Sequence, residues 1–356
     1  MSRVRLAIVD DSTFMRKALC RVLENEPDID IVGSAASGEE LLANINTWRP
    51  DVITLDLSMP GMGGLLTLEK IMEWKQIPVI ILSTHSTKET QLTIEALHRG
   101  AVDFIDKQRY SLMDFDSLRR VLVEKIFSIA ERKGEPRISD TQEALQAMMP
   151  ENQLLHARQP GMPGSYAALF VAASTGGPPA VQQILEDFGT SLSVPVAVVQ
   201  HMPEGFTKAF ADRLNSHFPF PVKEASHAEI FRPGTVYVGP TGYHLRLKRE
   251  EDKVYTLLAR HPETSAHRPS ADILFQSAAQ VYGGRAIGVI LTGMGKDGAS
   301  GMANLAEAGA FTISQNEVSS VVYGMPKAAV ELGVVREVLH IKRIGRRIIE
   351  LLNNKQ

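Results

Sequence analysis

The chain has 356 residues, of which 44% are hydrophobic and 22% are charged, and its formal net charge is −3 at pH 7. This balance is typical of a protein with sizeable cores, and it argues against a mainly electrostatic nucleic-acid binder, which usually carries a basic domain. The single cysteine, Cys20, excludes an intramolecular disulfide framework and any metal site built from several cysteines.

The N-terminal segment predicts a cytoplasmic protein. Its apolar run at residues 6–9 is shorter than the roughly 7–15 residues of a signal-peptide core. No run elsewhere approaches the roughly 18 apolar residues of a membrane span, so we expect no membrane insertion. Cys20 falls among apolar residues at helical spacing, and we expect it to be a buried thiol.

The first 130 residues alternate short apolar runs with amphipathic segments of helical period. The apolar runs have the length and β-branching of buried strands, and they occupy residues 6–9, 29–32, 52–55, 79–82 and 102–105. Ser12 can cap the first helix, and the later helices are predicted at residues 39–48, 65–74, 89–98 and 118–130. Five such units predict a first domain at residues 1–130 with a doubly wound, flavodoxin-like parallel sheet and helices on both faces.

A change in composition separates this domain from a second one. Residues 131–164 are rich in proline, glycine and polar residues and predict a linker, with space for a turn or two of helix near residues 141–148. Residues 165–350 return to apolar runs, at 167–172, 194–199, 286–291 and 311–314. Between them, residues 234–261 alternate apolar and polar residues around a turn at 249–252, which predicts an antiparallel hairpin. We therefore expect a second doubly wound, mainly parallel sheet with a hairpin insert.

Acidic side chains gather at the carboxyl ends of the predicted strands in the first domain. Asp10 and Asp11 follow the first strand, and Asp56 follows the third. Ligands of doubly wound sheets bind at this edge, and three converging carboxylates favour a hard cation such as Mg²⁺. Ser83 and Lys107 follow the fourth and fifth strands and add a hydroxyl and a cation. Each residue alone is also typical of a helix cap or a solvated surface, but together they indicate phosphoryl transfer onto a carboxylate.

On these residues the chain resembles a two-component receiver domain across residues 4–130. The resemblance rests on segments 9–12 (Val-Asp-Asp-Ser) and 56–62 (Asp-Leu-Ser-Met-Pro-Gly-Met), with the hydroxyl and the ammonium group that follow strands four and five. It implies that Asp56 is the phospho-acceptor. It also implies that the phosphoryl group is bound by Ser83 and Lys107, and that Mg²⁺ is held by Asp10, Asp11, Asp56 and the backbone carbonyl of Ser58.

Ser174 lies where a strand turns into a helix in the second domain. It is followed by Gly176 and Gly177, which permit close backbone approach, and by Pro178 and Pro179, which suit a first helical turn. The positive end of that helix would face the serine, which suits a nucleophile whose attack generates an oxyanion. A phosphate or anion site at the helix N-terminus explains this segment equally well.

A histidine and an aspartate follow two further strands. His201 comes after the run at 194–199, and Asp297 comes after the run at 286–291. Three strands would thus place a serine, a histidine and an aspartate at the same edge of the sheet. Catalytic triads consist of these three residues, and their order along the chain differs between folds. Taken singly, the histidine is also typical of a structural core residue, and Asp-Gly is a common turn pair. Five other histidines of this domain stay open as alternatives: His217, His227, His244, His261 and His267.

The second domain resembles the chemotaxis protein-glutamate methylesterases over residues 167–350. Five segments carry the resemblance in order: 173–178 (Ala-Ser-Thr-Gly-Gly-Pro), 200–207 (Gln-His-Met-Pro-Glu-Gly-Phe-Thr), 268–272 (Arg-Pro-Ser-Ala-Asp), 291–298 (Leu-Thr-Gly-Met-Gly-Lys-Asp-Gly) and 323–326 (Tyr-Gly-Met-Pro). By that resemblance Ser174 is the nucleophile, His201 the general base and acid, and Asp297 the orienting carboxylate. The backbone N–H of Met294 would contribute to an oxyanion hole.

The resemblance implies a hydrolase regulated by phosphorylation. It would hydrolyse glutamate γ-methyl esters on methyl-accepting chemoreceptors and deamidate specific glutamines, without a cofactor at the esterase site. A chemotaxis histidine kinase would supply the phosphoryl group to the Mg²⁺-dependent receiver, and no nucleic-acid partner is expected. The order of the modules and the length of the linker suggest how: the unphosphorylated receiver would restrict access to Ser174, and phosphorylation of Asp56 would relieve the restriction.

Other functions fit the same modules. The second domain could be a phosphorylation-controlled module that only grips receptors, or an esterase or amidase that acts on another protein or a small ester. A DNA-binding response regulator is disfavoured because the second half has no basic recognition helix. Arg268 and Ser270 would either contact substrate or form a helix cap with a surface arginine.

Overall fold

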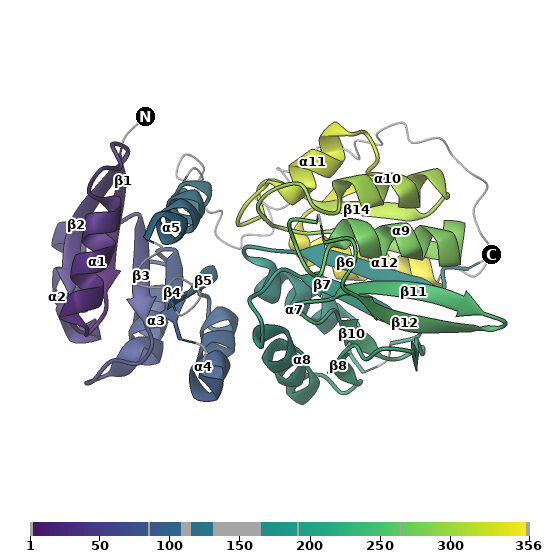
Figure 1. Cartoon of the computed structure of the whole chain (residues 1–356), viewed down its shortest axis with the longest axis horizontal. Coiled ribbons are helices and arrows are strands. Elements are labelled where there is room, and N and C mark those ends of the chain that lie inside the picture. The colour runs from purple at the N-terminus through teal and green to yellow at the C-terminus, as the bar shows by residue number, and fades with distance from the viewer. Residues whose placement is uncertain are drawn as a thin grey trace. The chain divides into compact units, whose positions relative to one another are not determined.

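The computed structural model describes residues 3–84, 86–107, 115–130, 165–190, 192–263 and 265–353. The chain divides into two compact units, residues 1–137 and 138–356, each with its own parallel sheet (Figure 1). The predicted linker at 131–164, with its possible helix near 141–148, lies outside the described residues. The limits of the linker therefore stay predictions.

Five parallel strands form the sheet of the N-terminal unit, in the order β2-β1-β3-β4-β5. They are β1 (Val4–Val9), β2 (Ile29–Ala35), β3 (Val52–Asp56), β4 (Val79–Ser83) and β5 (Asp103–Asp106). All five predicted strands are confirmed, because apolar runs of this length form strands that are covered on both faces. The order changes direction between β1 and β3, so their carboxyl ends flank the crevice where doubly wound sheets bind ligands.

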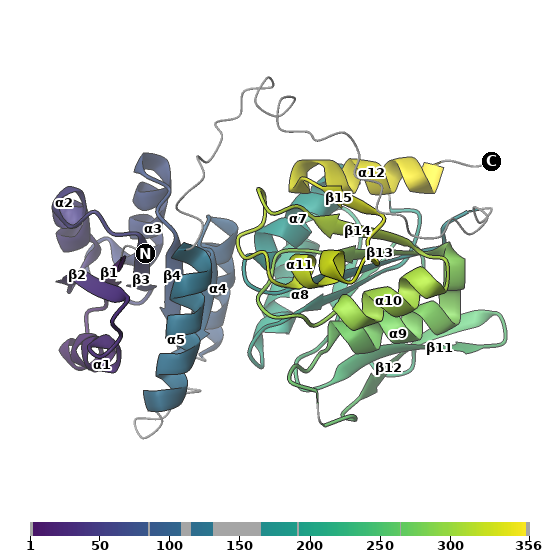
Figure 2. The same ribbon diagram turned by 90° about the horizontal axis from the view of Figure 1, so that it is seen from above.

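Helices cover both faces of this sheet. One face carries α1 and α5, which contact each other, and the other carries α2, α3 and α4 in series (Figure 2). Their bounds are α1 Thr13–Leu23, α2 Gly38–Trp48, α3 Gly63–Trp74, α4 Thr87–His98 and α5 Phe115–Ala130. Ser12 caps α1 as predicted, since its Oγ accepts a hydrogen bond from the N–H of Met15 at 3.3 Å. The expectation of a buried Cys20 is wrong: this residue is half-buried and lines a groove between α1 and β2.

Seven parallel strands form the main sheet of the C-terminal unit, in the order β15-β14-β13-β6-β7-β10-β8. They are β6 (Ala168–Ala173), β7 (Val196–Gln200), β8 (Val222–Glu224), β10 (Val236–Val238), β13 (Ala286–Ile290), β14 (Phe311–Gln315) and β15 (Glu337–Leu339). The order reverses at β6, which has β7 on one side and β13 on the other. The edge strands β8 and β15 have three residues each, too few for an apolar run to reveal them.

A separate antiparallel sheet, in the order β11-β12-β9, contains the predicted hairpin from His244 to Ala259. The start of the predicted stretch is wrong, because residues 236–238 form β10 of the parallel sheet instead. Its strands are β9 (Glu229–Ile230), β11 (His244–Glu250) and β12 (Lys253–Ala259). Glu250 pairs with Lys253, so the turn lies within the predicted stretch 249–252. The hairpin packs against α9 (Ala271–Tyr282) and adds Leu245 and Leu247 to the core that Phe170 and Phe275 form.

Helices flank the seven-stranded sheet on both faces (Figures 1 and 2). On one face α7 packs against α12, and on the other α9, α10 and α11 lie together, while α8 contacts β8 and β10. The bounds are α7 Gly177–Asp187, α8 Phe206–His217, α10 Ala299–Glu307, α11 Met325–Glu331 and α12 Ile341–Asn353, with a short 3₁₀ turn at Gly283–Arg285. In the described part of the chain, no helix has both the length and the apolar character to cross a membrane.

Candidate functional site

Three carboxylates meet at the switch point of the N-terminal sheet. Asp10 follows β1, Asp11 is the next residue, and Asp56 ends β3. Each offers a carboxylate oxygen within 4.8 Å of the others. Asp10 and Asp56 are buried, whereas Asp11 is exposed. Oxygen donors with this charge and spacing fit Mg²⁺, because solvent can complete the octahedral shell on the exposed side.

Lys107 neutralises part of this negative charge. Its Nζ lies 2.8 Å from Oδ2 of Asp56 and 3.3 Å from Oδ2 of Asp10. Burial opposes the charge of Lys107, but the two carboxylates outweigh burial and raise the pKa of the ammonium group. Burial raises the pKa of Asp10, and Lys107 offsets only part of that shift. The structure thus brings the lysine and the two buried carboxylates together.

Ser83 and Ser58 lie at the same edge of the sheet. Ser83 follows the β4 residue that pairs with Asp56, and its Oγ lies 2.7 Å from Oγ1 of Thr93, which donates to it. The N–H of Ser58 donates to Oδ1 of Asp56 at 3.2 Å. The hydroxyl of Ser58 points elsewhere, to a carboxylate of α4.

That carboxylate, Glu89, was not predicted as part of the site. Its Oε1 accepts from the Ser58 hydroxyl at 2.9 Å, and its Oε2 accepts from the N–H of Thr84 at 2.6 Å. Burial would raise the pKa of Glu89, but the hydrogen bonds from Thr84 and Ser58 outweigh it and lower the pKa. Glutamate is common in the first turn of a helix, where its negative charge interacts favourably with the helix dipole. The sequence therefore carries no sign that Glu89 would connect the loops of Ser58 and Thr84.

Three adjacent strands, β7, β6 and β13, position the predicted residues of the C-terminal unit. Ala173 of β6 pairs with Gln200 of β7, so Ser174 and His201 are the next residues on neighbouring strands. On the other side of β6, the N–H of Ser174 donates to the carbonyl of Thr292 at 3.0 Å. The candidate site therefore straddles the point where the strand order reverses, as ligand sites of doubly wound sheets do.

The backbone packs closely around Ser174, which is half-buried. The N–H of Gly177 donates to the carbonyl of Ser174 at 2.7 Å, and α7 begins there after Gly176, whose φ is 75°. A Cβ on Gly177 would lie 2.0 Å from Oε1 of Gln200, and a Cβ on Gly293 would lie 2.8 Å from Cβ of Ser174. Backbone without side chains therefore borders the serine on both sides.

Met294, the predicted oxyanion donor, follows Gly293 directly and is half-buried. The backbone of Gly293 is held on both sides: its N–H donates to Val322 at 3.0 Å, and its carbonyl accepts from Met325 at 2.8 Å. The peptide bond between Gly293 and Met294 therefore belongs to a hydrogen-bonded strand end beside the serine.

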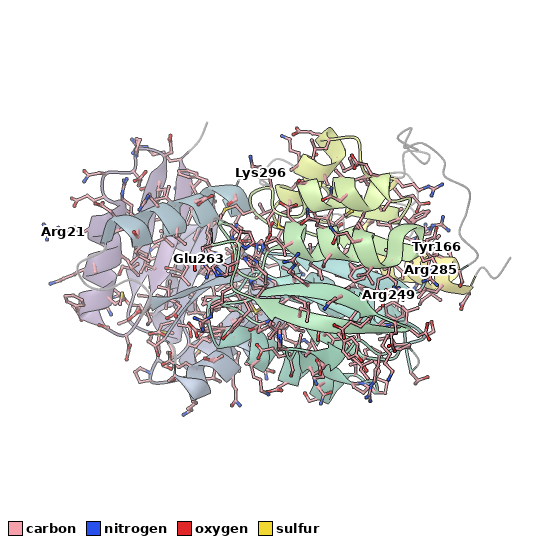
Figure 3. All side chains as sticks on the ribbon, turned by 45° about the vertical axis from the view of Figure 1, so that its right-hand side comes forward. Arg21, Tyr166, Arg249, Glu263, Arg285 and Lys296 are labelled. Atoms are coloured by element: carbon pink, nitrogen blue, oxygen red, sulfur yellow. The ribbon has the colours of Figure 1, made fainter. Side chains whose placement is uncertain are left out.

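His201 and Asp297 form a direct pair. Nε2 of His201 lies 2.8 Å from Oδ2 of Asp297, and each side chain is only 9% exposed. The other ring nitrogen, Nδ1, is buried and has no hydrogen-bond partner among the described residues. Asp297 follows the exposed Lys296 at the carboxyl end of the sheet, opposite to the end that carries Tyr166 (Figure 3). Buried polar atoms are nearly always paired, so Nδ1 marks where a proton-transfer partner is expected.

Asp297 also closes the N-terminus of α9. Its Oδ1 accepts from the hydroxyl of Ser270 at 2.8 Å and from the N–H of Asp272 at 3.2 Å, and its Oδ2 accepts from the N–H of Ala271 at 2.7 Å. Burial alone would raise the pKa of Asp297, but the hydrogen bonds from His201, Ala271 and Ser270 hold it well below its usual range. The Ser270 hydroxyl does not cap α9 itself, as one alternative expected, but donates to Asp297.

Asp272 makes the reverse connection from α9 to α10. Its Oδ1 accepts from the N–H groups of Gly298 at 3.0 Å and Gly301 at 2.6 Å, at the start of α10. Burial raises the pKa of Asp272, and the N–H of Gly301 opposes that shift. Each of two adjacent helices is thus capped by a carboxylate from the other one's N-terminal segment, which fixes Asp297 in place against His201.

Two of the histidines that stayed open lie against this cluster. The ring of His267 stacks on that of His201, with centroids 4.1 Å apart and planes inclined by 11°. His244 is fully buried; its Nε2 lies 3.1 Å from the carbonyl of Pro262, and its Nδ1 accepts from the N–H of Ser270 at 3.3 Å. The other three have partners outside the cluster: His217 faces Glu186, His227 accepts from Leu258, and His261 faces Glu263.

Protonation of His244 is expected to destabilise the C-terminal unit. Burial lowers the pKa of His244 below the ordinary value of 6.5. A lowered folded-state pKa means that the stability contributed by the neutral ring is complete above pH 6.5 and is lost as the pH falls through the folded value. Denaturant unfolding from about pH 7 to about pH 5 should show this loss, and His244→Gln should have a shallower pH slope. Identical slopes in both proteins would contradict this role.

Both units of the chain match known protein families. Residues 169–348 match the family model described as CheB methylesterase, and residues 6–114 match the model of the response regulator receiver domain. Proteins named protein-glutamate methylesterase/protein-glutamine glutaminase from Halalkalibacterium halodurans and Clostridium acetobutylicum are each 38% identical, over 98% and 99% of this chain and of their own lengths. The crystal structure of the Thermotoga maritima CheB methylesterase catalytic domain is 39% identical, covers 52% of this chain and 99% of its own, and superposes with a TM-score of 0.51.

Proposed function

This chain belongs to the CheB methylesterase family and carries a response regulator receiver domain, and from that premise we propose how its residues perform the reaction. It is a protein-glutamate methylesterase and protein-glutamine glutaminase. The nucleophile is Ser174, His201 is the general base and acid, and Asp297 orients the imidazole.

The observation that carries this proposal is the ring of His201. Its Nε2 pairs with Asp297, while its buried Nδ1 has no partner in the described part of the chain. The ionised carboxylate accepts from Nε2–H, which leaves the lone pair on Nδ1, so the unpartnered nitrogen is the basic one. A simple anion site at the start of α7 would gain nothing from a histidine held in this tautomer. The geometry therefore favours Ser174 as a nucleophile over Ser174 as an anion ligand.

The residues then act in a fixed order. Oγ of Ser174 attacks the ester carbonyl while Nδ1 of His201 takes its proton, and Asp297 stabilises the imidazolium. Backbone N–H groups, including that of Met294, bind the oxyanion. His201 returns the proton to the leaving group, which departs as methanol from a methyl ester or ammonia from a glutamine. A water activated by His201 then hydrolyses the acyl-serine, releases glutamate and restores the hydroxyl.

The receiver supplies the control. Phosphorylation takes place on Asp56, with Ser83 and Lys107 binding the phosphoryl group. Mg²⁺ would be held by Asp10, Asp11, Asp56 and the backbone carbonyl of Ser58, and when bound it neutralises the charge of the incoming phosphoryl oxygens. The substrates are methyl-accepting chemoreceptors, the phosphodonor is a chemotaxis histidine kinase, and the protein works in the cytoplasm.

Phosphorylation of Asp56 is expected to raise methanol release from a methylated receptor by about tenfold, the middle of the range for coupled sites. With a small acyl phosphate and Mg²⁺, the intact protein should gain the mass of one phosphoryl group, and Asp56→Asn or chelation of Mg²⁺ should prevent both the mass gain and the activation. The variant keeps the unstimulated rate, because Asp56 is not part of the esterase site. Activation of Asp56→Asn to the same level would contradict this control.

The choice of substrate has its own test. Methanol release from methylated receptor should far exceed release from a simple methyl ester at equal ester concentration, because positioning by the receptor contributes to the rate. Equal turnover would instead indicate an esterase for other substrates. Receptor binding with no methanol release at all would indicate a module that only grips the receptor.

A further inference from the structure

His201 is covered by a second imidazole. The ring of His267 lies 4.1 Å from that of His201 between centroids, and the 11° inclination makes the two rings nearly parallel. The remainder of His267 is exposed to solvent. The established reaction assigns it no role, yet it stacks on the ring that must accept and return a proton.

The segment that carries His267 is anchored at both ends. One buried side chain, His244 of β11, contacts the carbonyl of Pro262 through Nε2 and the N–H of Ser270 through Nδ1. Between these points, the hydroxyl of Ser265 donates to the carbonyl of His267 at 2.9 Å. The carbonyl of Arg268 accepts from Gly242 at 3.2 Å. The described residues around the stack are therefore held by β11, through His244, and by the loop before it, through Gly242.

We propose that His267 is a positioning residue for the esterase reaction: it holds the plane of the His201 ring so that Nε2 stays on Asp297 and Nδ1 stays free to act as the base. The inference rests on the proposed role of His201. A ring with a single hydrogen-bonded edge can rotate about its bonds, and a flat neighbour in contact with one face removes that freedom. Small displacements of a general base are costly, so a contact that prevents them accelerates the reaction.

The charge of His267 matters as much as its shape. Burial lowers the pKa of His267 to about 4, and the charge that His201 can carry adds to this shift. The carboxylate of Asp297 opposes the shift but is weaker. Among the described residues, His201 and Asp297 are the titratable groups whose charge acts on it. His267 is therefore neutral when the enzyme works, and it leaves the imidazolium of His201 unopposed during the reaction.

The test compares four replacements of His267 in the full chain, with methylated receptor as substrate. His267→Ala removes the stack and should lower kcat about tenfold with little change in KM. His267→Phe restores a flat ring and should recover most of that loss. His267→Met and His267→Lys have similar length and differ in charge. The lysine should move the acid limb of the kcat/KM profile to lower pH by about half a unit relative to the methionine, because a fixed cation opposes protonation of His201.

Melting temperatures measured on the same samples separate positioning from folding. The proposal is overturned if His267→Ala keeps the wild-type kcat, if His267→Phe is as slow as His267→Ala at an unchanged melting temperature, or if the lysine and methionine variants share one acid limb. Ser174→Ala is run alongside. Retained activity there would refute the proposed triad itself, whereas an inactive Ser174→Ala with unaffected His267 variants would refute only the positioning role.

Discussion

Replacing Ser174 with alanine is expected to lower methanol release and ammonia release by about 10⁴-fold or more, since removal of a serine nucleophile leaves only the oxyanion donors and substrate binding. Both activities should fall together, because both use the same hydroxyl. Receptor binding and melting temperature should stay close to wild type, as one half-buried hydroxyl is removed without a cavity or a clash.

The matched control is Ser300→Ala, which removes an exposed hydroxyl from α10. It should leave both reactions unchanged, because Ser300 has no place in the proposed mechanism. A Ser174→Ala protein that binds receptor and still releases methanol at a tenth of the wild-type rate or faster would rule out Ser174 as the nucleophile. A loss of ester hydrolysis with normal deamidation would show that the two reactions use different groups.

Asp297→Asn is the second substitution with a large expected effect, a fall in kcat of about 10⁴-fold. The amide carries no charge and cannot stabilise the imidazolium of His201. Its NH₂ group donates, so it favours the tautomer in which Nε2 accepts and the proton lies on Nδ1, where it blocks the base. The same change weakens the acceptor for three groups at the start of α9, Ser270, Ala271 and Asp272. Loss of this cap should cost about 1 kcal/mol of stability, visible in denaturant unfolding.

Asp272→Asn separates the two roles of Asp297. It weakens the reciprocal cap on Gly298 and Gly301 but does not touch the His201 ring in the described contacts. We expect a similar loss of stability with kcat reduced far less than in Asp297→Asn. If both variants lose activity equally at a temperature where both are folded, the effect of Asp297 is structural, and its electrostatic role is refuted.

The strand ends were predictable because apolar runs and the residues that follow them are local features. Runs such as 52–55 and 286–291 predict buried strands, and parallel strands end at one edge. That reasoning brought Asp10, Asp56 and Lys107 to one place in the N-terminal unit, and the structure confirms it with the 2.8 Å contact of the lysine to Asp56. It also anticipated that His201 and Asp297 would meet.

What the sequence did not predict depends on contacts between distant segments. The stack of His267 on His201 joins a loop before α9 to the end of β7, and nothing in either stretch marks the pairing. The signal nearest to it is position: His267 directly precedes Arg-Pro-Ser-Ala-Asp, one of the segments that carries the family resemblance. Likewise, the exchange of caps between Asp272 and Asp297 arises because α9 and α10 lie side by side.

The most direct test of the account is the site of covalent attack. An organophosphonate ester that reacts with activated serine hydroxyls should form one adduct, which mass spectrometry should place on Ser174, with methanol release lost in proportion to labelling. His201→Gln should slow the labelling, because Nδ1 no longer removes the serine proton. An adduct on any other residue, or a fully labelled protein that still demethylates receptor, would contradict the assignment of Ser174 as the nucleophile.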